Sequence, residues 1–437
     1  MIKIFKFLGR LFFKITGYLP LRILLRQRYY KENHYKKGHS VKGGAILIAN
    51  HTHIMDYFTM IFAHPFRKQR CLVSELIYQK PFLGFCSNVM DNILVHRERS
   101  DLSFMGEAEN TLKKGGVITI FPEGHLVKTG KLDTFKPTVV YLALRSGAPI
   151  IPHYIEPHYF KSKRTRIIMG KPIYLRDYCD ELNPSKEKVE ELCQMLQRKV
   201  NELKRLLELY KRYHTQDTLS FHNAFYDFIK ANMIIPTLIG FPAKIHYASG
   251  ASKEDWKIKG RGLIVSKHFG FLDPPILLVH CFKRRCHIII AQELYEKWPW
   301  FFKEALTIEY RRLESSSDPK CFLESINILK ADGVVGIYPE GHLNPDGIGE
   351  IHDGAAYFAL MSNSPIYFYY MLKPYKIFHR NHIMIGKTLY PEEVLGKNYV
   401  KSKENIATLT SIINQRFIDL QNEGKKYIEK RQKNVKK

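Results

Sequence analysis

The sequence predicts an α/β protein made of two repeated domains, each with a mixed, mainly parallel sheet flanked by helices. Short apolar runs alternate with helical patterns along the chain, which is typical of strands covered on both faces. The chain also repeats itself, because its two Pro-Glu-Gly-His tetrapeptides, at residues 122–125 and 339–342, lie 217 residues apart. These two observations define the fold class and the number of domains.

The same interval of 217 residues separates two histidine–aspartate pairs, His51 with Asp56 and His268 with Asp273. Two further pairs with this spacing, at 96–101 and 222–227, have no copy at that interval. The duplication therefore selects among the pairs, since a pattern this short also arises by chance. We place one domain at residues 1–215 and the second at 216–437.

Apolar, partly β-branched runs predict the buried strands. The runs before His51 and His268 would deliver each histidine at the C-terminal end of a strand, where open α/β sheets place their chemistry. Long amphipathic patterns predict that a helix closes each domain. The expected strands are 44–49, 71–74, 93–95, 117–121, 150–155, 166–169 and 262–266, and the expected helices are 102–113, 138–145, 185–214 and 403–430.

Two segments suggest contact with a lipid surface. Residues 2–14 are apolar but carry a cation every three or four positions, which predicts an interfacial amphipathic helix; a core helix with a solvated basic face is the alternative. Residues 231–243 contain no charge and would lie in the interface or pack against the first half. Neither segment reaches the roughly 18 apolar residues of a membrane-spanning helix.

The composition restricts the class of partner. The 437 residues carry a formal charge of +26, which favours phospholipid headgroups, phosphorylated small molecules or nucleic acid. Nucleic acid is disfavoured because the charge is not gathered beside a recognisable binding module. The seven cysteines have scattered spacing, which indicates reduced thiols in a protein that faces the cytosol.

The order of motifs in each half resembles the glycerolipid acyltransferases, typified by 1-acylglycerol-3-phosphate acyltransferase. A His-x4-Asp motif is followed by Val-His-Arg at 95–97, by Phe-Pro-Glu-Gly at 121–124 or Tyr-Pro-Glu-Gly at 338–341, and by an apolar strand. The resemblance implies acyl transfer from acyl-CoA or acyl carrier protein to a lysolipid, most simply 1-acylglycerol 3-phosphate. Together with the basic, apolar N-terminus and the scattered cysteines, it leads us to expect a peripheral protein on the cytoplasmic face of a membrane.

Residue roles follow from this resemblance and from the chemistry of acyl transfer. His51 and His268 would act as general bases, while Asp56 and Asp273 would fix the imidazole tautomer. The thioester is already activated, so no cofactor or metal is required. The expected substrate-binding residues are Arg97, Glu123 and Gly124 in the first half and Arg311, Glu340 and Gly341 in the second.

These binding residues have different expected functions. Arginine suits a bidentate contact with phosphate, although a surface salt bridge is the alternative for Arg97. Glu123 would accept hydrogen bonds from the acceptor hydroxyl or from its own loop, and Gly124 would permit a tight turn. A metal site with His51, His53 and His125 is not expected, because Gly270 stands where His53 would repeat.

Both halves depart from the family pattern after the Glu-Gly turn. His-Leu, at 125–126 and 342–343, replaces a hydroxyl residue followed by arginine. Lys128 or Lys136 could supply the missing cation in the first half, whereas the second has Asn344 and Asp353 near those places. The departure leaves two alternatives: another lysolipid or an amino lipid as acceptor, or a catalytically degenerate, basic membrane-surface protein.

Overall fold

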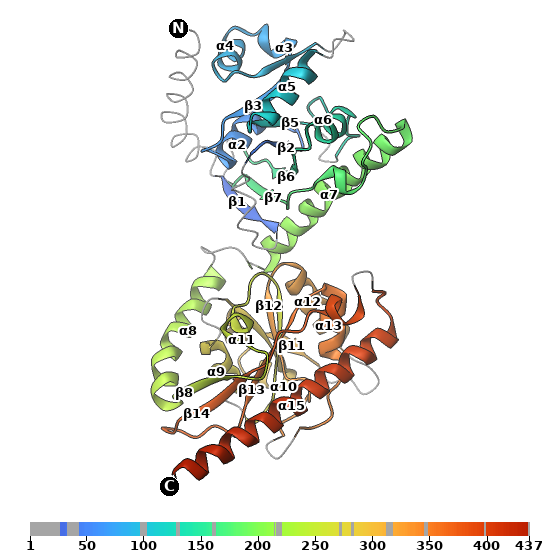
Figure 1. Ribbon diagram of the computed structural model, residues 1–437. Coiled ribbons are helices and arrows are strands. Elements are labelled where there is room, and N and C mark those ends of the chain that lie inside the picture. Colours follow the sequence, from blue (N-terminus) through green and yellow to red (C-terminus); the bar gives the residue numbers. More distant parts are fainter. Residues whose placement is uncertain are drawn as a thin grey trace. The chain divides into compact units, whose positions relative to one another are not determined.

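The computed structural model describes residues 27–32, 43–96, 103–127, 132–159, 163–213, 215, 221–270, 273–280, 284–311, 318–344, 348–396 and 399–435. The chain forms two compact units, Met1–Glu208 and Leu209–Lys437 (Figure 1). This division lies close to the boundary that we expected at residue 215. The predicted N-terminal helix and Arg97 lie outside the described residues.

The first unit contains a seven-stranded sheet in the order β1-β7-β6-β2-β5-β3-β4. Only the β6–β7 pair is antiparallel among these described strands, so the sheet is mixed but mainly parallel. The strands are β1 Arg28–Lys31, β2 Ala45–Ala49, β3 Gln69–Ser74, β4 Ile93–Val95, β5 Val117–Ile120, β6 Ile150–Glu156 and β7 Arg166–Met169.

The second unit repeats this sheet. Its order, β8-β14-β13-β9-β12-β10-β11, is that of the first sheet with each strand replaced by its counterpart, and β13–β14 is again antiparallel. The strands are β8 Ala243–Tyr247, β9 Gly262–Ser266, β10 Cys286–Ala291, β11 Ile308–Tyr310, β12 Val334–Ile337, β13 Ile366–Met371 and β14 Asn381–Ile385. The predicted fold class and the duplication are therefore confirmed.

Helices flank both sheets. The first unit has α2 Asp56–Ala63, α3 Glu75–Tyr78, α4 Pro81–Val89, α5 Ser103–Lys113, α6 Thr138–Ser146 and the 3-10 turn η3 Leu175–Asp177; α7 Lys186–Tyr213 ends in the second unit. The second unit has α8 Phe221–Gly240, η4 Lys253–Trp256, α9 Asp273–His280, α10 Gln292–Tyr295, α11 Pro299–Glu304, α12 Pro319–Lys330, α13 Gly354–Ser362, α14 Pro391–Leu395 and α15 Lys403–Val435.

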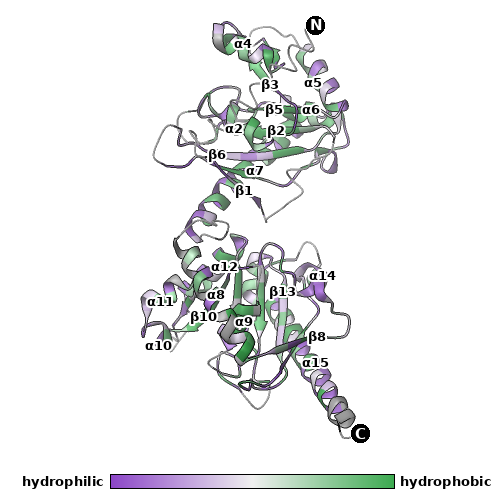
Figure 2. Cartoon of the chain, turned by 90° about the vertical axis from the view of Figure 1, so that its left-hand side faces the viewer, coloured by the Kyte–Doolittle hydropathy of each residue, from purple (hydrophilic) through white to green (hydrophobic). Residues whose placement is uncertain are grey.

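Each central strand contributes alternate residues to opposite faces of its sheet. In β9, Leu263 and Val265 pack with α12, α13 and α15, whereas Ile264 packs with residues of α9 on the other face. All five residues of β2 are buried, as expected for a parallel strand between two helical layers. Figure 2 shows the contrast between the apolar central strands and α15, along which hydrophobic and hydrophilic residues alternate.

This architecture places two loops side by side in each unit. Strands β2 and β5 are parallel neighbours, so the residues after Ala49 and after Ile120 emerge at the same edge of the sheet. Strands β9 and β12 are paired in the same way in the second unit. The histidine motif and the Glu-Gly turn, 72 residues apart in sequence, therefore meet at the carboxyl edge.

Candidate active site

His51 lies in the loop that joins β2 to α2, and Asp56 is the first residue of α2. The distance from His51 Nδ1 to Asp56 Oδ2 is 3.3 Å, and the His51 side chain is 20% exposed whereas that of Asp56 is fully buried. The imidazole also stacks on Phe121, with 4.1 Å between ring centroids. One nitrogen thus faces the carboxylate, which leaves the other for contact with a substrate.

The buried Asp56 carboxylate is surrounded by donors. Its Oδ2 accepts hydrogen bonds from the backbone N–H groups of Thr52 and His53, at 2.7 and 2.8 Å. Its Oδ1 accepts a bond of 2.5 Å from the hydroxyl of Tyr159, a residue that the sequence patterns did not indicate. These bonds stabilise the charged carboxylate away from solvent and fix its orientation toward His51.

Glu123 connects the Glu-Gly turn to the histidine loop. Its Oε2 accepts a hydrogen bond of 2.9 Å from His51 N–H, and its Oε1 accepts one of 3.2 Å from Asp133 N–H. The side chain is buried, and this desolvation raises the pKa of Glu123. Among the two partners expected for Glu123, the geometry favours the loop, so its contact with substrate stays a prediction.

The turn itself brings the two motifs into register. Gly124 has a φ of +73°, a conformation that favours glycine, as the expected tight turn requires. Three residues later, Val127 N–H donates a hydrogen bond of 2.7 Å to the carbonyl of His51. The third motif therefore holds His51 on both sides, with the Glu123 carboxylate at its N–H group and the Val127 backbone N–H at its carbonyl.

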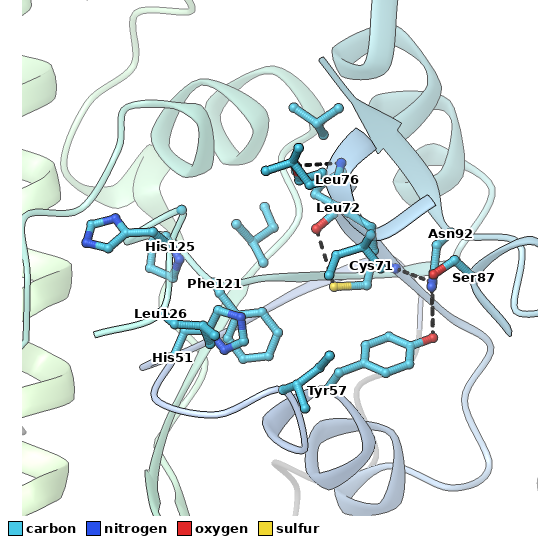
Figure 3. Close-up of a pocket in the computed structure, with 18 of the residues that line it drawn as sticks. His51, Tyr57, Cys71, Leu72, Leu76, Ser87, Asn92, Phe121, His125 and Leu126 are labelled. Carbon is cyan, nitrogen blue, oxygen red and sulfur yellow. Dashed lines mark hydrogen bonds between the residues drawn. The ribbon is translucent and has the colours of Figure 1, made fainter. Parts of the chain in front are cut away.

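A cavity of about 450 Å³ opens beside His51 (Figure 3). His51, Phe121, His125 and Leu126 lie on one side of it in Figure 3, while Asn92, Ser87 and Cys71 lie on the other. Most of the remaining lining side chains are apolar: Ile54, Phe58, Leu72, Val73, Leu76, Ile77, Leu83, Val95, Phe104, Ile120 and Val139. The cavity can therefore hold a long apolar group with one end at the imidazole.

The second unit reproduces the histidine–aspartate pair. His268 Nδ1 lies 2.9 Å from Asp273 Oδ2, which also accepts bonds from the N–H groups of Phe269 and Gly270 at 2.6 and 2.8 Å. The ring of His268 stacks on Tyr338, with centroids 4.3 Å apart. Asn344 N–H donates to the His268 carbonyl at 2.9 Å, as Val127 does to His51.

The Glu-Gly turn of the second unit keeps its geometry but changes its contacts. Gly341 has a φ of +68°, and the buried Glu340 accepts a hydrogen bond of 3.0 Å from Gly349 N–H. The other carboxylate oxygen of Glu340 lies 3.8 Å from the buried ammonium of Lys267. Glu340 is thus bound to protein groups, and its predicted contact with substrate stays a prediction.

Lys267 takes the place of Asn50, and the two side chains act differently. Asn50 exchanges two hydrogen bonds, of 2.7 and 2.9 Å, with the backbone of Ile155 and so holds β2 against β6. Lys267 instead points toward Glu340 and lies 4.8 Å from the ring centroid of Phe269. The second site therefore has a buried ion pair at the position where the first has an uncharged side chain bonded to the backbone.

A second difference concerns the aspartates. Asp273 Oδ1 is buried, and no described residue donates a hydrogen bond to it, whereas Asp56 Oδ1 accepts one from Tyr159. Tyr375 occupies the corresponding region and packs its hydroxyl against Gly270, the counterpart of His53. The two pairs therefore share their geometry but not their full hydrogen-bond environment.

The predicted pairing of Arg311 with Arg97 is wrong by one position. Val95, the last residue of β4, pairs with Ser74, the last residue of β3. Tyr310, the last residue of β11, pairs in the same way with Ala291, the last residue of β10. Val95 and Tyr310 therefore correspond, so the residues that follow them, His96 and Arg311, correspond as well. Arg311 is exposed, and its guanidinium Nε lies 3.1 Å from Glu309 Oε1. The counterpart of Arg97 is Arg312, and both lie outside the described residues.

The histidines near His51 have partners within the protein. No group of three histidine, cysteine, aspartate or glutamate side chains with a suitable arrangement occurs among the described residues. His53 Nδ1 accepts a bond from Met55 N–H, and His125 Nε2 lies 3.1 Å from Asp133 Oδ2. These histidines therefore have other partners near the site.

Comparison with known proteins adds independent information. A family model described as "Acyltransferase" matches residues 26–156 and again residues 245–371. The chain is 23% identical over 141 residues to a chloroplastic 1-acyl-sn-glycerol-3-phosphate acyltransferase of Brassica napus, which covers 30% of this chain and 40% of the relative. It is 32% identical over 115 residues to the enzyme of that name from Borreliella burgdorferi, which covers 25% and 45%.

The alignments thus span less than half the length of these relatives. Among solved structures, the 1-acyl-sn-glycerophosphate acyltransferase PlsC of Thermotoga maritima is 19% identical, with a TM-score of 0.34. That similarity covers 47% of this chain and 98% of the other. The family model, which matches both units, carries the assignment to a family.

Proposed function

Because this chain belongs to the acyltransferase family, in two copies, we propose that each unit transfers an acyl group from a thioester to the hydroxyl of a lysolipid. The donor would be acyl-CoA or acyl carrier protein. The observation that carries the proposal is the histidine–aspartate pair at the mouth of an apolar cavity, with the pair repeated in the second unit. No cofactor is needed for this reaction.

In the proposed mechanism, the free ring nitrogen of His51 takes the proton of the acceptor hydroxyl. The hydroxyl oxygen then attacks the thioester carbonyl carbon, a C–O bond forms, and the C–S bond breaks. The imidazolium returns the proton to the departing thiolate. Asp56 stabilises the imidazolium through Nδ1 throughout, and His268 with Asp273 would act in the same way.

We assign the apolar cavity to the acyl chain of the donor. Its volume, about 450 Å³, falls in the ordinary range of ligand sites, about 300–1,000 Å³, and its lining is mainly aliphatic and aromatic. A chain bound there would present its thioester carbonyl to His51 at the cavity mouth. Such positioning of the reacting carbon is a major part of the expected rate acceleration.

The preferred acceptor is 1-acylglycerol 3-phosphate, giving phosphatidic acid. The names of the relatives support this choice, and Lys136 supplies a cation beside the Glu-Gly turn of the first unit. Leu126 and Leu343, both exposed where the family pattern has arginine, favour an alternative: a lysolipid or amino lipid without a terminal phosphate. Arg97 remains a proposed phosphate ligand.

We also propose that the protein binds the cytoplasmic face of a membrane as a peripheral protein. Among the described helices, none is long and apolar enough to cross a membrane. Helix α8 nevertheless exposes Phe228, Leu238 and Ile239, and Phe378, 74% exposed, is bound through its N–H to Gly240 at the end of α8. Apolar side chains of this kind would enter the lipid interface.

Neighbouring groups support the same orientation. The exposed tryptophans Trp298 and Trp300 flank the start of α11, a helix that contacts α8. Exposed cations lie near Phe378 in sequence, namely Lys376 and Arg380, and would meet anionic headgroups. Tryptophan beside cations is typical of the membrane interface, where its ring is half in contact with water.

The catalytic proposal is tested by acyl transfer from radiolabelled acyl-CoA across a panel of lysolipids. His51→Ala and His268→Ala should each remove the turnover of one unit, since loss of a general base costs about 10² to 10⁴ in rate. The double variant should lose nearly all activity while its circular dichroism stays unchanged. Full activity in the double variant would exclude this mechanism, whereas absence of acyl transfer by the unmodified protein would favour a degenerate membrane-surface protein.

A further inference from the structure

Lys136 occupies a defined place in the first site. Its N–H donates a hydrogen bond of 2.8 Å to the carbonyl of Pro122, so the chain returns to the Glu-Gly turn at this residue. Its side chain then lies over Gly124, where an added Cβ would be 2.8 Å from the ammonium nitrogen. The glycine thus leaves room for the lysine head.

The ammonium faces the same cavity as the catalytic base. His51, Gly124 and Lys136 all line it, and Lys136 is the one lysine or arginine among the described lining residues. The neighbouring His125 lies against the carboxylate of Asp133, at 3.1 Å. Lys136 therefore supplies the positive charge for an anionic group bound at the mouth of the cavity.

The second unit has histidine in this place. His352 N–H donates a hydrogen bond of 3.0 Å to the carbonyl of Pro339, which is the counterpart of Pro122. The His352 ring lies over Gly341, where an added Cβ would be 3.3 Å from Cδ2. The loop is one residue shorter here, so the counterpart of Lys136 is His352 and not Asp353, as the sequence interval suggested.

We propose that this exchange sets the acceptor headgroup of each unit. Lys136 selects a lysolipid with a phosphate monoester at the first site. The second site, with His352 in that place, accepts lysolipids whose headgroup is uncharged or zwitterionic at least as well as the phosphorylated one. Lysine is cationic at every assay pH, whereas imidazole loses its charge between about pH 5 and 8. The inference rests on the proposed acyl transfer.

Phosphate chemistry has two sources in this reaction, the acceptor and the coenzyme A part of the donor. The two are separated by the choice of substrates. Lysophosphatidic acid is compared with monoacylglycerol as acceptor, first with acyl-CoA and then with an acyl thioester of N-acetylcysteamine, which carries no phosphate. If substitution of Lys136 changes the preference between the two acceptors with both donors, the proposal is supported. If the change appears only when the donor is acyl-CoA, the proposal is overturned.

The experiment exchanges the two residues in full-length protein at pH 8. In the His268→Ala background, Lys136→His should lower the ratio of kcat/KM for lysophosphatidic acid over monoacylglycerol about tenfold, the low end for a lost charged hydrogen bond at an exposed site. Lys136→Arg should restore the ratio. In the His51→Ala background, His352→Lys should raise it by a similar factor.

Controls distinguish the possible failures. Lys171→His changes an exposed lysine that does not line the cavity, so its ratio should stay that of the parent. Unchanged ratios in both Lys136→His and Lys136→Met would overturn the proposal, as would equal acceptor selectivity of the two parent units. Absence of acyl transfer in the unmodified protein with every acceptor would instead refute the proposed function.

Discussion

Tyr159→Phe isolates the contribution of the buried aspartate environment to turnover. The substitution keeps the ring but removes the only described donor to Asp56 Oδ1, a bond of 2.5 Å between buried groups. Burial, together with the nearby Asp56 carboxylate, raises the pKa of Tyr159, so its hydroxyl remains protonated and donates throughout the assay range. Phenylalanine would leave one carboxylate oxygen buried without a donor.

The magnitude follows from the remaining bonds. A hydrogen bond to a charged group is worth about 1.5–3 kcal/mol, or roughly 10- to 150-fold if all of it acts in the transition state. Asp56 Oδ2 still faces His51 and keeps the two backbone donors, so the imidazole stays oriented. We therefore expect kcat to fall about tenfold. KM should change little, because Tyr159 does not line the cavity.

The assay uses the His268→Ala background, with thermal unfolding recorded to verify folding. The matched control is Tyr375→Phe in the His51→Ala background, where no described residue donates to Asp273 Oδ1. That control should leave kcat within about twofold, since Asp273 Oδ1 has no described donor that the substitution could remove. An unchanged kcat in Tyr159→Phe, or equal losses in both variants, would refute the assignment of Tyr159 as a positioning residue.

Two further predictions concern the second unit, which contains all three tryptophans of the chain. Burial lowers the pKa of His287 in the folded protein to about 4, whereas a histidine in the unfolded chain has a pKa of about 6.5. Between about pH 6.5 and pH 4 the unfolded state therefore binds a proton that the folded state does not. The free energy of unfolding should fall by about 3 kcal/mol as the pH is lowered through this range. Urea unfolding followed by tryptophan fluorescence should show this slope, and His287→Leu should flatten it. For the lipid surface, brominated anionic lipids should quench Trp298 and Trp300 in full-length protein, and salt should weaken the effect. Phe378→Glu should reduce quenching, whereas the control Leu323→Glu on α12 should not. Deletion of residues 1–25 should lower vesicle binding, and full quenching in Phe378→Glu would refute the assignment of Phe378 to the lipid interface.

The parallel core of each sheet was predictable because burial on both faces leaves a simple signal. Runs such as Ala45–Ala49 and Gly262–Ser266 contain no charged residue and are mostly apolar, and all of their residues are buried. The edge strands β1 and β8 were missed. Their sequences, RYYK and AKIHY, mix charged and aromatic residues, and the burial of β8 is only partial. An edge strand has one neighbour and so leaves a weaker pattern.

The two histidine–aspartate pairs were predictable for a different reason. A histidine five residues before an aspartate at a strand end needs only local geometry, and the repeat selected two pairs whose side chains lie within 3.3 Å of each other. Tyr159 lies 103 residues from Asp56 and reaches it only because the chain returns after β6. No local spacing encodes that contact, and the same holds for the bond between Val127 and His51.

Loop length explains the two errors of correspondence. A fixed interval of 217 residues is correct at the motifs but fails after any loop that differs in length. The segment between β10 and β11 is two residues shorter than that between β3 and β4, which moves Arg311 opposite His96. The loop before His352 is one residue shorter, which places histidine and not Asp353 over Gly341. Corresponding residues of the two units are therefore identified by backbone pairing and not by a fixed sequence interval.

The contrast between backbone contacts and side-chain contacts explains how two sites with the same geometry can prefer different acceptors. In both units the aspartate is held by two backbone N–H groups, and the histidine carbonyl by the N–H of a residue in the third motif. Backbone donors do not depend on side-chain identity, so valine and asparagine serve equally at positions 127 and 344. The side chain over the turn is not held to that geometry, and there lysine has been exchanged for histidine. Selectivity should therefore follow Lys136 and His352, while turnover follows the shared pair.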